Sequence, residues 1–194
     1  MTEDEQDIAL IGAALRMATE SGWRRVSVVT AAREAGVPLP VARARFPSRH
    51  AILLRLGRLA DQAVLAEAPA EGSVRDRLFD MLMRRIDALQ NHRAGVIAVL
   101  RGLPYDPPTA LMLACATRRS MRWMLEAAGV PATGLTGELR VRGLVGVWLW
   151  TVRAWERDDS TDLSATMAAL DIALSRAEEI AGWLGGKGRT AEAE

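Results

Sequence analysis

Apolar residues recur three or four positions apart along nearly the whole chain, a spacing that places side chains on one face of an α-helix. Two of the clearest runs are Ile8, Ile11, Leu15, Ala18 and Leu78, Leu82, Ile86, Leu89. No segment alternates apolar and polar residues in the manner of a half-buried strand. The sequence therefore predicts an all-α protein of about nine helices.

The composition limits the class of protein. The 194-residue chain is 49% hydrophobic, which excludes a largely disordered protein and allows a sizeable core. No apolar run reaches about 18 residues, so we expect no membrane span. The amino-terminal residues MTEDEQD are acidic, unlike a signal peptide, and we expect a cytoplasmic protein. Cys115 is the only cysteine, which excludes an internal disulfide and a cysteine-based zinc site.

Positive charge is concentrated near the amino terminus. Between Ile8 and Ala60 there are nine arginines and only two acidic residues, Glu20 and Glu34, whereas the rest of the chain after Ala60 is mildly acidic. Such a basic segment suits an anionic partner. The alternative is a solvated, arginine-rich surface without a partner, because arginine replaces lysine almost everywhere in this sequence.

Two short helices are expected within the basic segment. Ser27 can cap a helix that ends at Gly36, because a serine hydroxyl accepts a hydrogen bond from a helix start and glycine adopts the left-handed conformation at a helix end. Pro38 and Pro40 then fall in the first turn of the next helix, where proline is tolerated. Another helix is expected to follow Ser48.

These two helices have the spacing of a helix-turn-helix. The motif needs small residues where its helices cross, and Ala32, Gly36 and Ala42 meet this need. In such a motif the first helix crosses the DNA backbone and the second enters the major groove. The three small residues are common ones, so the spacing alone is a weak signal.

The surrounding residues resemble the amino-terminal domain of the TetR family of transcriptional regulators over about residues 8 to 55. The matching positions are Gly22-Trp23, Val26-Ser27-Val28, Ala31-Ala32, Ala35-Gly36-Val37, Phe46, Ser48-Arg49 and Leu53-Leu54. The chain departs from the family pattern in three places. Pro40 replaces a glycine of the recognition helix, Arg43 replaces an aromatic phosphate contact, and Arg49-His50 replaces Lys-Glu.

The resemblance implies that the chain is divided into three parts. Residues 1–50 are expected to form a helix-turn-helix DNA-binding domain, and residues 51–185 a helical domain for effector binding and dimerisation. Residues 186–194 are expected to form a flexible tail. Family members bind a small effector among the helices of the body, and their last two helices pair in a dimer.

The resemblance also implies which side chains meet operator DNA. Arg43 and Arg49 can contact phosphates through their forked donors, and Ser27 can contribute at the start of its helix. Base reading would then fall to Thr30, Leu39, Val41 and Arg45, with the apolar pair against thymine methyl groups and the arginine on guanine. The alternative is that Leu39 and Val41 pack inward and that Arg45 is merely exposed.

The body is rich in side chains that suit a hydrophobic ligand. Six tryptophans and eight methionines occur in the chain, and methionine adapts its shape while tryptophan offers a large rigid face. The residues expected to line an effector pocket are Phe79, Met83, Met112, Met121, Met124 and Trp148. The alternative is that each belongs to an ordinary core.

Two late helices suit a dimer interface. The segment GLVGVWLWTV, within an expected helix from Arg140 to Arg157, is apolar all round and must be covered on both sides. The final helix is expected from about Thr161 to Leu184. The predicted interface residues are Gly143, Gly146, Trp150, Met167, Leu170 and Leu174. A monomer with both helices in one core is the alternative.

Nothing in the sequence indicates catalysis. His50 and His92 lie in different parts of the chain, there is no glycine-rich phosphate loop, and Asp158, Asp159 and Asp162 resemble solvated helix-capping charges. We expect no enzyme, no metal and no cofactor.

The favoured function is a homodimeric DNA-binding regulator modulated by a hydrophobic small molecule, and the resemblance implies that it is a repressor. One alternative is a TetR-like fold that has lost DNA reading and binds a lipid or isoprenoid, as in ubiquinone-biosynthesis accessory proteins. A purely structural interaction module is a third.

Overall fold

The structure is a computed structural model that describes the backbone of residues 2–66 and 71–190, with side chains up to residue 180. Within these residues it contains nine α-helices, two short 3-10 helices and no strand, which confirms the predicted fold class. The elements are α1 (Glu3–Ser21), η1 (Trp23–Arg25), α2 (Val28–Glu34), α3 (Leu39–Arg45), α4 (Arg49–Leu65), α5 (Val74–Gln90), α6 (Arg93–Gly102), η2 (Leu103–Tyr105), α7 (Pro107–Ala127), α8 (Gly134–Trp155) and α9 (Ser164–Thr190).

The chain forms two compact units. The first contains residues 1–63 and 87–117, and the second contains residues 64–86 and 118–194. The expected domain boundary at residue 50 stays a prediction. Of the expected tail, the backbone up to Thr190 continues α9, and residues 191–194 lie outside the described residues.

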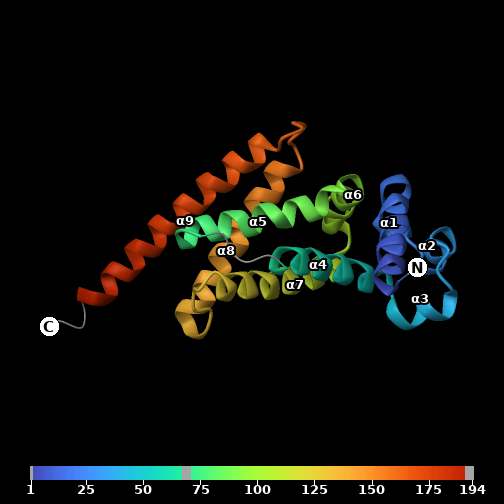
Figure 1. The fold of residues 1–194 in the computed structure, drawn as a ribbon, viewed down its shortest axis with the longest axis horizontal. Helices are drawn as coiled ribbons and strands as arrows, with labels where there is room; N and C mark the ends of the chain where they lie inside the picture. The colour runs from blue at the N-terminus through green and yellow to red at the C-terminus, as the bar shows by residue number, and fades with distance from the viewer. Residues whose placement is uncertain (1, 67–70, 191–194) are drawn as a thin grey trace. The chain divides into compact units, whose positions relative to one another are not determined.

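Helix α1 is the centre of the first unit, where it contacts η1, α2 and α6, while α2 contacts α3 (Figure 1). It begins at Glu3, before the first apolar residue of the expected helix, Ile8. The reason is a capping box: the Thr2 hydroxyl accepts a hydrogen bond from the Glu5 backbone, and the Glu5 side chain accepts one from the Thr2 backbone. The acidic residues at the start of the chain therefore belong to a helix.

Helix α6 packs very closely on α1 at Gly95. A Cβ atom on Gly95 would lie 2.5 Å from the Leu15 Cβ atom and 2.7 Å from the Leu15 carbonyl oxygen. No side chain larger than hydrogen fits there without displacing one of the helices. This contact fixes α6, and the η2 turn that follows it, against the helix that carries the amino-terminal residues.

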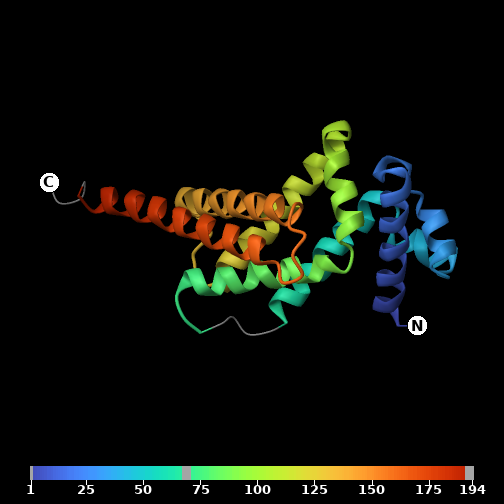
Figure 2. The ribbon, with the colours of Figure 1, turned by 90° about the horizontal axis from the view of Figure 1, so that it is seen from above.

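In the second unit, α8 and α9 run side by side (Figure 2). Helix α8 begins at Gly134 and not at Arg140, so the predicted start was wrong by almost two turns. The glycines of GVPATGLTG suggested a break. Gly137 is instead a buried helical residue, placed where a Cβ atom would meet the Ala132 backbone at 2.3 Å. Close packing, and not a turn, requires a glycine at this position.

The connection from α8 to α9 is organised by a buried aspartate. Asp158 accepts hydrogen bonds from the Thr166 backbone N–H and hydroxyl, both at 2.7 Å, and from Ser160. The expectation that Asp158 is a solvated capping charge was wrong, because the side chain is buried. Hydrogen bonds from Ser160 and Thr166 hold the pKa of this carboxyl well below its ordinary value. Helix α9 accordingly starts at Ser164, slightly later than the expected Thr161.

Among the described residues, no helix combines the length and the apolar character needed to cross a membrane.

Candidate nucleic-acid interface

The helix-turn-helix is built from α2, α3 and the turn between them. The Ser27 hydroxyl accepts a hydrogen bond from the Thr30 backbone N–H at 3.3 Å, which confirms the predicted cap. Gly36 has a φ of 67°, a left-handed conformation that favours glycine, so the predicted helix end is also confirmed. The turn is closed by the Val37 N–H, which donates to the Ala32 carbonyl at 2.8 Å. Ala32 and Ala42 are buried where the helices cross.

Pro40 does not disturb α3. Pro38 is the residue before the helix, and Pro40 lies in its first turn, where backbone N–H groups have no partner within a helix. The replacement of the family glycine by proline is thus compatible with a regular short helix. Its ring also adds apolar surface, since Pro40 is exposed.

The predicted DNA-contacting residues differ in their exposure. Thr30, Leu39 and Arg43 are exposed, with Leu39 at 40%, whereas Ser27, Val41, Arg45 and Arg49 are half-buried. Leu39 therefore does not pack inward. The two half-buried arginines are already engaged with other parts of the first unit.

Arg45, at the end of α3, is held by α1. Its Nη2 atom lies 2.8 Å from the Asp7 carboxylate and donates to the Glu3 carbonyl oxygen at 2.9 Å. The same Asp7 oxygen accepts a hydrogen bond from Arg55 Nε at 2.7 Å. Asp7 is only 4% exposed, so it forms a buried bridge between α1, α3 and α4. A base contact by Arg45 would require this bridge to open.

Arg49, at the start of α4, is held in a second network. Its Nη1 donates to the Arg24 carbonyl oxygen at 2.9 Å, and its Nη2 donates to Asp106 at 3.1 Å. Beside it, His50 Nε2 and the Thr109 hydroxyl are 2.9 Å apart. Hydrogen bonds from Thr109, with Arg49 nearby, hold the pKa of Asp106 below its ordinary value. Arg49 thus connects η1, α4 and the turn before α7.

Five other arginines of the head, by which we mean residues 2–60, stay free. They are exposed, and none forms an ion pair within the described part of the chain. These residues are Arg24, Arg25, Arg33, Arg43 and Arg58. Only Arg43 was singled out from the sequence. The arginine count of the segment could have indicated the others, but not which arginines would be neutralised by Asp7 and Asp106.

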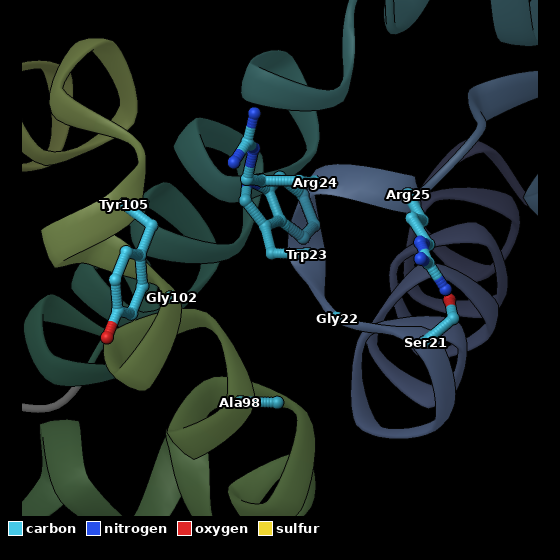
Figure 3. Close-up of a pocket in the computed structure, with 8 residues that line it drawn as sticks. All are labelled: Ser21, Gly22, Trp23, Arg24, Arg25, Ala98, Gly102 and Tyr105. Carbon is cyan, nitrogen blue, oxygen red and sulfur yellow. The ribbon is translucent and has the colours of Figure 1, made fainter.

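A surface hollow adjoins this region within the first unit. It has a volume of about 710 Å³ and is lined by residues of η1, α6 and η2. Trp23 and Tyr105 stand on opposite walls, with Arg24 beside Trp23 and Ala98 on α6 (Figure 3). Two of the free arginines, Arg24 and Arg25, thus line the same hollow as the exposed Tyr105, whereas Trp23 is buried.

An exposed apolar stripe runs along α8 in the second unit. Val141, Leu144, Val147 and Trp148 face the interior of the unit. On the opposite side the exposed residues are Leu135, Leu139, Gly143, Gly146, Leu149 and Trp150. Both faces of this helix are thus apolar, as its sequence indicates, and only one of them is covered within the chain.

The arrangement of helices resembles that of several solved proteins. No protein-family model matches the sequence, and no curated protein matches it. The crystal structure of a TetR transcriptional regulator from Nitrosomonas europaea matches with a TM-score of 0.70 and 21% identity, over 89% of this chain and 97% of that one. A TetR-family regulator from Streptomyces coelicolor matches with a TM-score of 0.63 and 21% identity, over 95% and 85% of the two chains. A TetR regulator from Rhodococcus sp. RHA1 gives 0.61 and 20%, over 90% and 96%.

The chain has the fold of the TetR-family transcriptional regulators. The resemblance noted over about residues 8 to 55 therefore extends, as a fold, over most of the chain. At these levels of identity the likeness concerns the arrangement of helices, and the chemistry must be argued from this chain's own side chains.

In this TetR fold, the residues predicted to line an effector pocket do not all lie in one unit. Met112 belongs to the first unit, and the other five belong to the second. Met121, Met124 and Trp148 are buried, and Phe79 and Met83 are half-buried. The Trp148 ring lies 5.1 Å below the guanidinium of Arg85, which is itself buried. Burial lowers the pKa of Arg85 to about 10, so it remains charged at neutral pH.

The predicted interface residues of α9 are not on a free surface. Leu170 and Leu174 are buried within the second unit and Met167 is half-buried, so these side chains help α9 to pack in its own core. Ile172 of the same helix is exposed and was not predicted. No group of three or more histidine, cysteine, aspartate or glutamate side chains among the described residues could hold a metal ion.

Proposed function

We propose that this protein is a transcriptional regulator whose head binds operator DNA. The observation that supports it most is the set of five exposed, unpaired arginines around the helix-turn-helix. Unpaired guanidinium groups are available for phosphate oxygens, which they bind through two parallel hydrogen bonds. The chain shares its fold with solved TetR regulators, and in this proposal the helix-turn-helix of that fold positions the arginines.

In this proposal the predicted contacts have different tasks. Arg43 binds phosphate directly, while Leu39, Val41 and Thr30 face the bases. Ser27 fixes the start of α2 through its hydrogen bond to Thr30. Arg45 and Arg49 are held in ion pairs with Asp7 and Asp106. They can contact DNA only when these ion pairs break.

We propose that two copies pair through the exposed stripe of α8. Leu135, Leu139 and Trp150 supply apolar surface that water would otherwise cover. Gly143 and Gly146 lie in the same stripe and allow a partner helix to approach closely. Leu170 and Leu174 contribute indirectly, by holding α9 against α8. A two-fold dimer presents two heads, which suits a palindromic operator.

We further propose that a hydrophobic effector binds among the helices of residues 51–185, and that the regulator represses transcription. The methionine and tryptophan side chains around Met121, Met124 and Trp148 can repack around an apolar ligand. Such a ligand controls DNA binding only if it binds one arrangement of the two heads more tightly than the other. In this proposal the protein binds DNA and a ligand and catalyses no reaction. It acts in the cytoplasm, which contains the operator DNA.

The experiment is selection of bound fragments from a pool of random duplexes by the full chain. We expect enrichment of one palindromic sequence. A variant with Arg33→Gln and Arg43→Gln should enrich nothing, whereas the matched control Arg119→Gln, an exposed arginine of α7 outside the head, should enrich the same palindrome. No enrichment by the wild-type chain, together with a co-purified lipid, would replace this proposal by the lipid-binding alternative.

A further inference from the structure

We propose that α3 reads its operator mainly through the C5-methyl groups of thymine, an inference that rests on the proposed DNA binding. The face of α3 that is proposed to meet the bases is mostly apolar. Arg45, the arginine at the end of α3 that could have bound guanine, is held in an ion pair with Asp7. Both observations come from the arrangement of side chains around α3.

The outer face of α3 follows from its one buried residue. Ala42 is buried against the rest of the motif. At 3.6 residues per turn, Pro40 and Ala44 point to the opposite side. Leu39, three positions before Ala42, lies nearer the packed side but is still 40% exposed, and Pro40, Arg43 and Ala44 are exposed as well. Leu39, Pro40 and Ala44 are apolar, so Arg43 is the one hydrogen-bond donor among these four exposed side chains.

Arg45 is withdrawn from this face. Its side chain is 23% exposed, and its Nη2 atom is shared between the buried Asp7 carboxylate and the Glu3 carbonyl. Moving Arg45 onto a base would leave Asp7 with one cation in place of two, in a buried position where an unpaired charge is costly. Reading by Arg45 is therefore disfavoured compared with reading by side chains that need no rearrangement.

The neighbouring helix α2 carries exposed apolar surface of its own. Val29 is 47% exposed, and it precedes Thr30, whose methyl group adds to the same kind of surface. Arg33 and Arg43 are the free cations of α2 and α3. An apolar centre with cations beside it is complementary to a major groove, in which base edges lie between two rows of phosphates.

Thymine presents the one apolar group in the major groove, its C5-methyl, and the four base pairs are distinguished there partly by its position. Leu39, Pro40 and Val29 can exclude water from such methyl groups. Each contacted methyl should contribute about fourfold to affinity, the value for burying one carbon of this size. The operator is thus expected to hold thymines at defined positions of each half-site.

The test uses the full chain and its selected duplex, with thymine replaced by deoxyuridine one position at a time. Deoxyuridine keeps the base pairing and the O4 acceptor and lacks only the methyl group. We expect about fourfold weaker binding at each contacted position, and little change elsewhere. If no deoxyuridine substitution weakens binding, and 7-deazaguanine at a guanine does, then an arginine reads the site and the inference is wrong.

A variant separates a direct contact from an effect of DNA shape. Leu39→Ala should bind the thymine and deoxyuridine duplexes equally at the position that Leu39 contacts. Leu111→Ala, a control at a leucine of α7 that is 68% exposed, should keep the fourfold preference. An unchanged preference in Leu39→Ala at every position would overturn the assignment to α3. If the wild-type chain binds no duplex, the proposed DNA binding itself is wrong. If it binds a duplex with the same affinity whether or not the methyl groups are present, only the inference about thymine is wrong.

Discussion

Asp7 of α1 and Arg45 of α3 form an ion pair with a distance of 2.8 Å, and the same carboxylate also binds Arg55 of α4. One buried acid therefore joins three helices of the head. From the sequence, Asp7 was noted only as one of the acidic residues of MTEDEQD, before the first apolar residue of the expected helix. In the fold its carboxylate is 4% exposed and pairs with Arg45 and Arg55, which are themselves only 23% and 18% exposed.

Replacing Asp7 with asparagine should lower the free energy of unfolding by about 2–3 kcal/mol, because Arg45 and Arg55 would lose a buried charged partner. The matched control is Asp4→Asn. Asp4 pairs with Arg55 as well, but its side chain is largely exposed, so the loss should stay below about 0.5 kcal/mol. Urea denaturation measures both. Equal losses in the two variants would show that the Asp7 bridge adds no stability of its own.

Gly95→Ala should destabilise the first unit by about 2–3 kcal/mol, because the new methyl group would overlap Leu15. Gly57→Ala is the control, since a Cβ atom at Gly57 of α4 meets nothing within 4 Å. Alanine is the better helix former, so this variant should gain about 0.5–1 kcal/mol. Thermal unfolding followed by circular dichroism should move the two midpoints in opposite directions. A Gly95→Ala protein as stable as wild type would contradict the close packing of α6 on α1.

Asp158 predicts a pH dependence. Its pKa is lowered in the folded chain, so the unfolded chain binds the proton more readily, and the stabilisation is complete above the ordinary carboxyl value of 3.8. It is lost as the pH falls below that value towards the lowered pKa. At pH 7, Asp158→Asn should be less stable than wild type by about 2 kcal/mol.

The measurement for Asp158 is the difference in unfolding free energy between wild type and Asp158→Asn at several pH values. This difference should be constant near neutrality and should shrink in acid below about pH 4. A difference that does not change down to pH 2 would mean that the lowered pKa is not the source of the stabilisation.

Trp150→Asp should convert the proposed dimer into a monomer, because a charge would replace an apolar side chain in the middle of the α8 stripe. Trp150 is 53% exposed in the single chain. The control, Trp123→Asp, changes a tryptophan of α7 that is 62% exposed and outside the stripe, and it should leave the assembly unchanged. Sedimentation equilibrium distinguishes the two masses. A dimer that survives Trp150→Asp would exclude this face as the interface.

The sequence predicted most of the helices because their apolar faces repeat regularly, as in α5 with Leu78, Leu82 and Ile86. It also predicted the motif at Ser27 and Gly36, where one cap and one left-handed residue mark the ends of a helix. The start of α8 was missed, because the reason for Gly137 is a contact with Ala132 that only the folded chain reveals.

The charge chemistry of the head was harder to predict. A count of arginines indicates a basic surface, but not which guanidinium groups stay free. Arg49 is neutralised by Asp106, which lies 57 positions away, and Arg45 by Asp7 on another helix. Ion pairs between distant positions leave no periodic signal in a sequence. They nevertheless decide which arginines are available to a nucleic acid.

The salt dependence of binding to the selected duplex tests the central claim most directly. If the five free arginines contact phosphates in both subunits, the logarithm of affinity should fall with the logarithm of salt concentration with a slope between roughly −4 and −9. Arg43→Gln should reduce the size of that slope by about 2, one phosphate in each subunit, while Arg119→Gln leaves it unchanged. A wild-type slope near zero, or a slope that Arg43→Gln does not alter, would contradict the account.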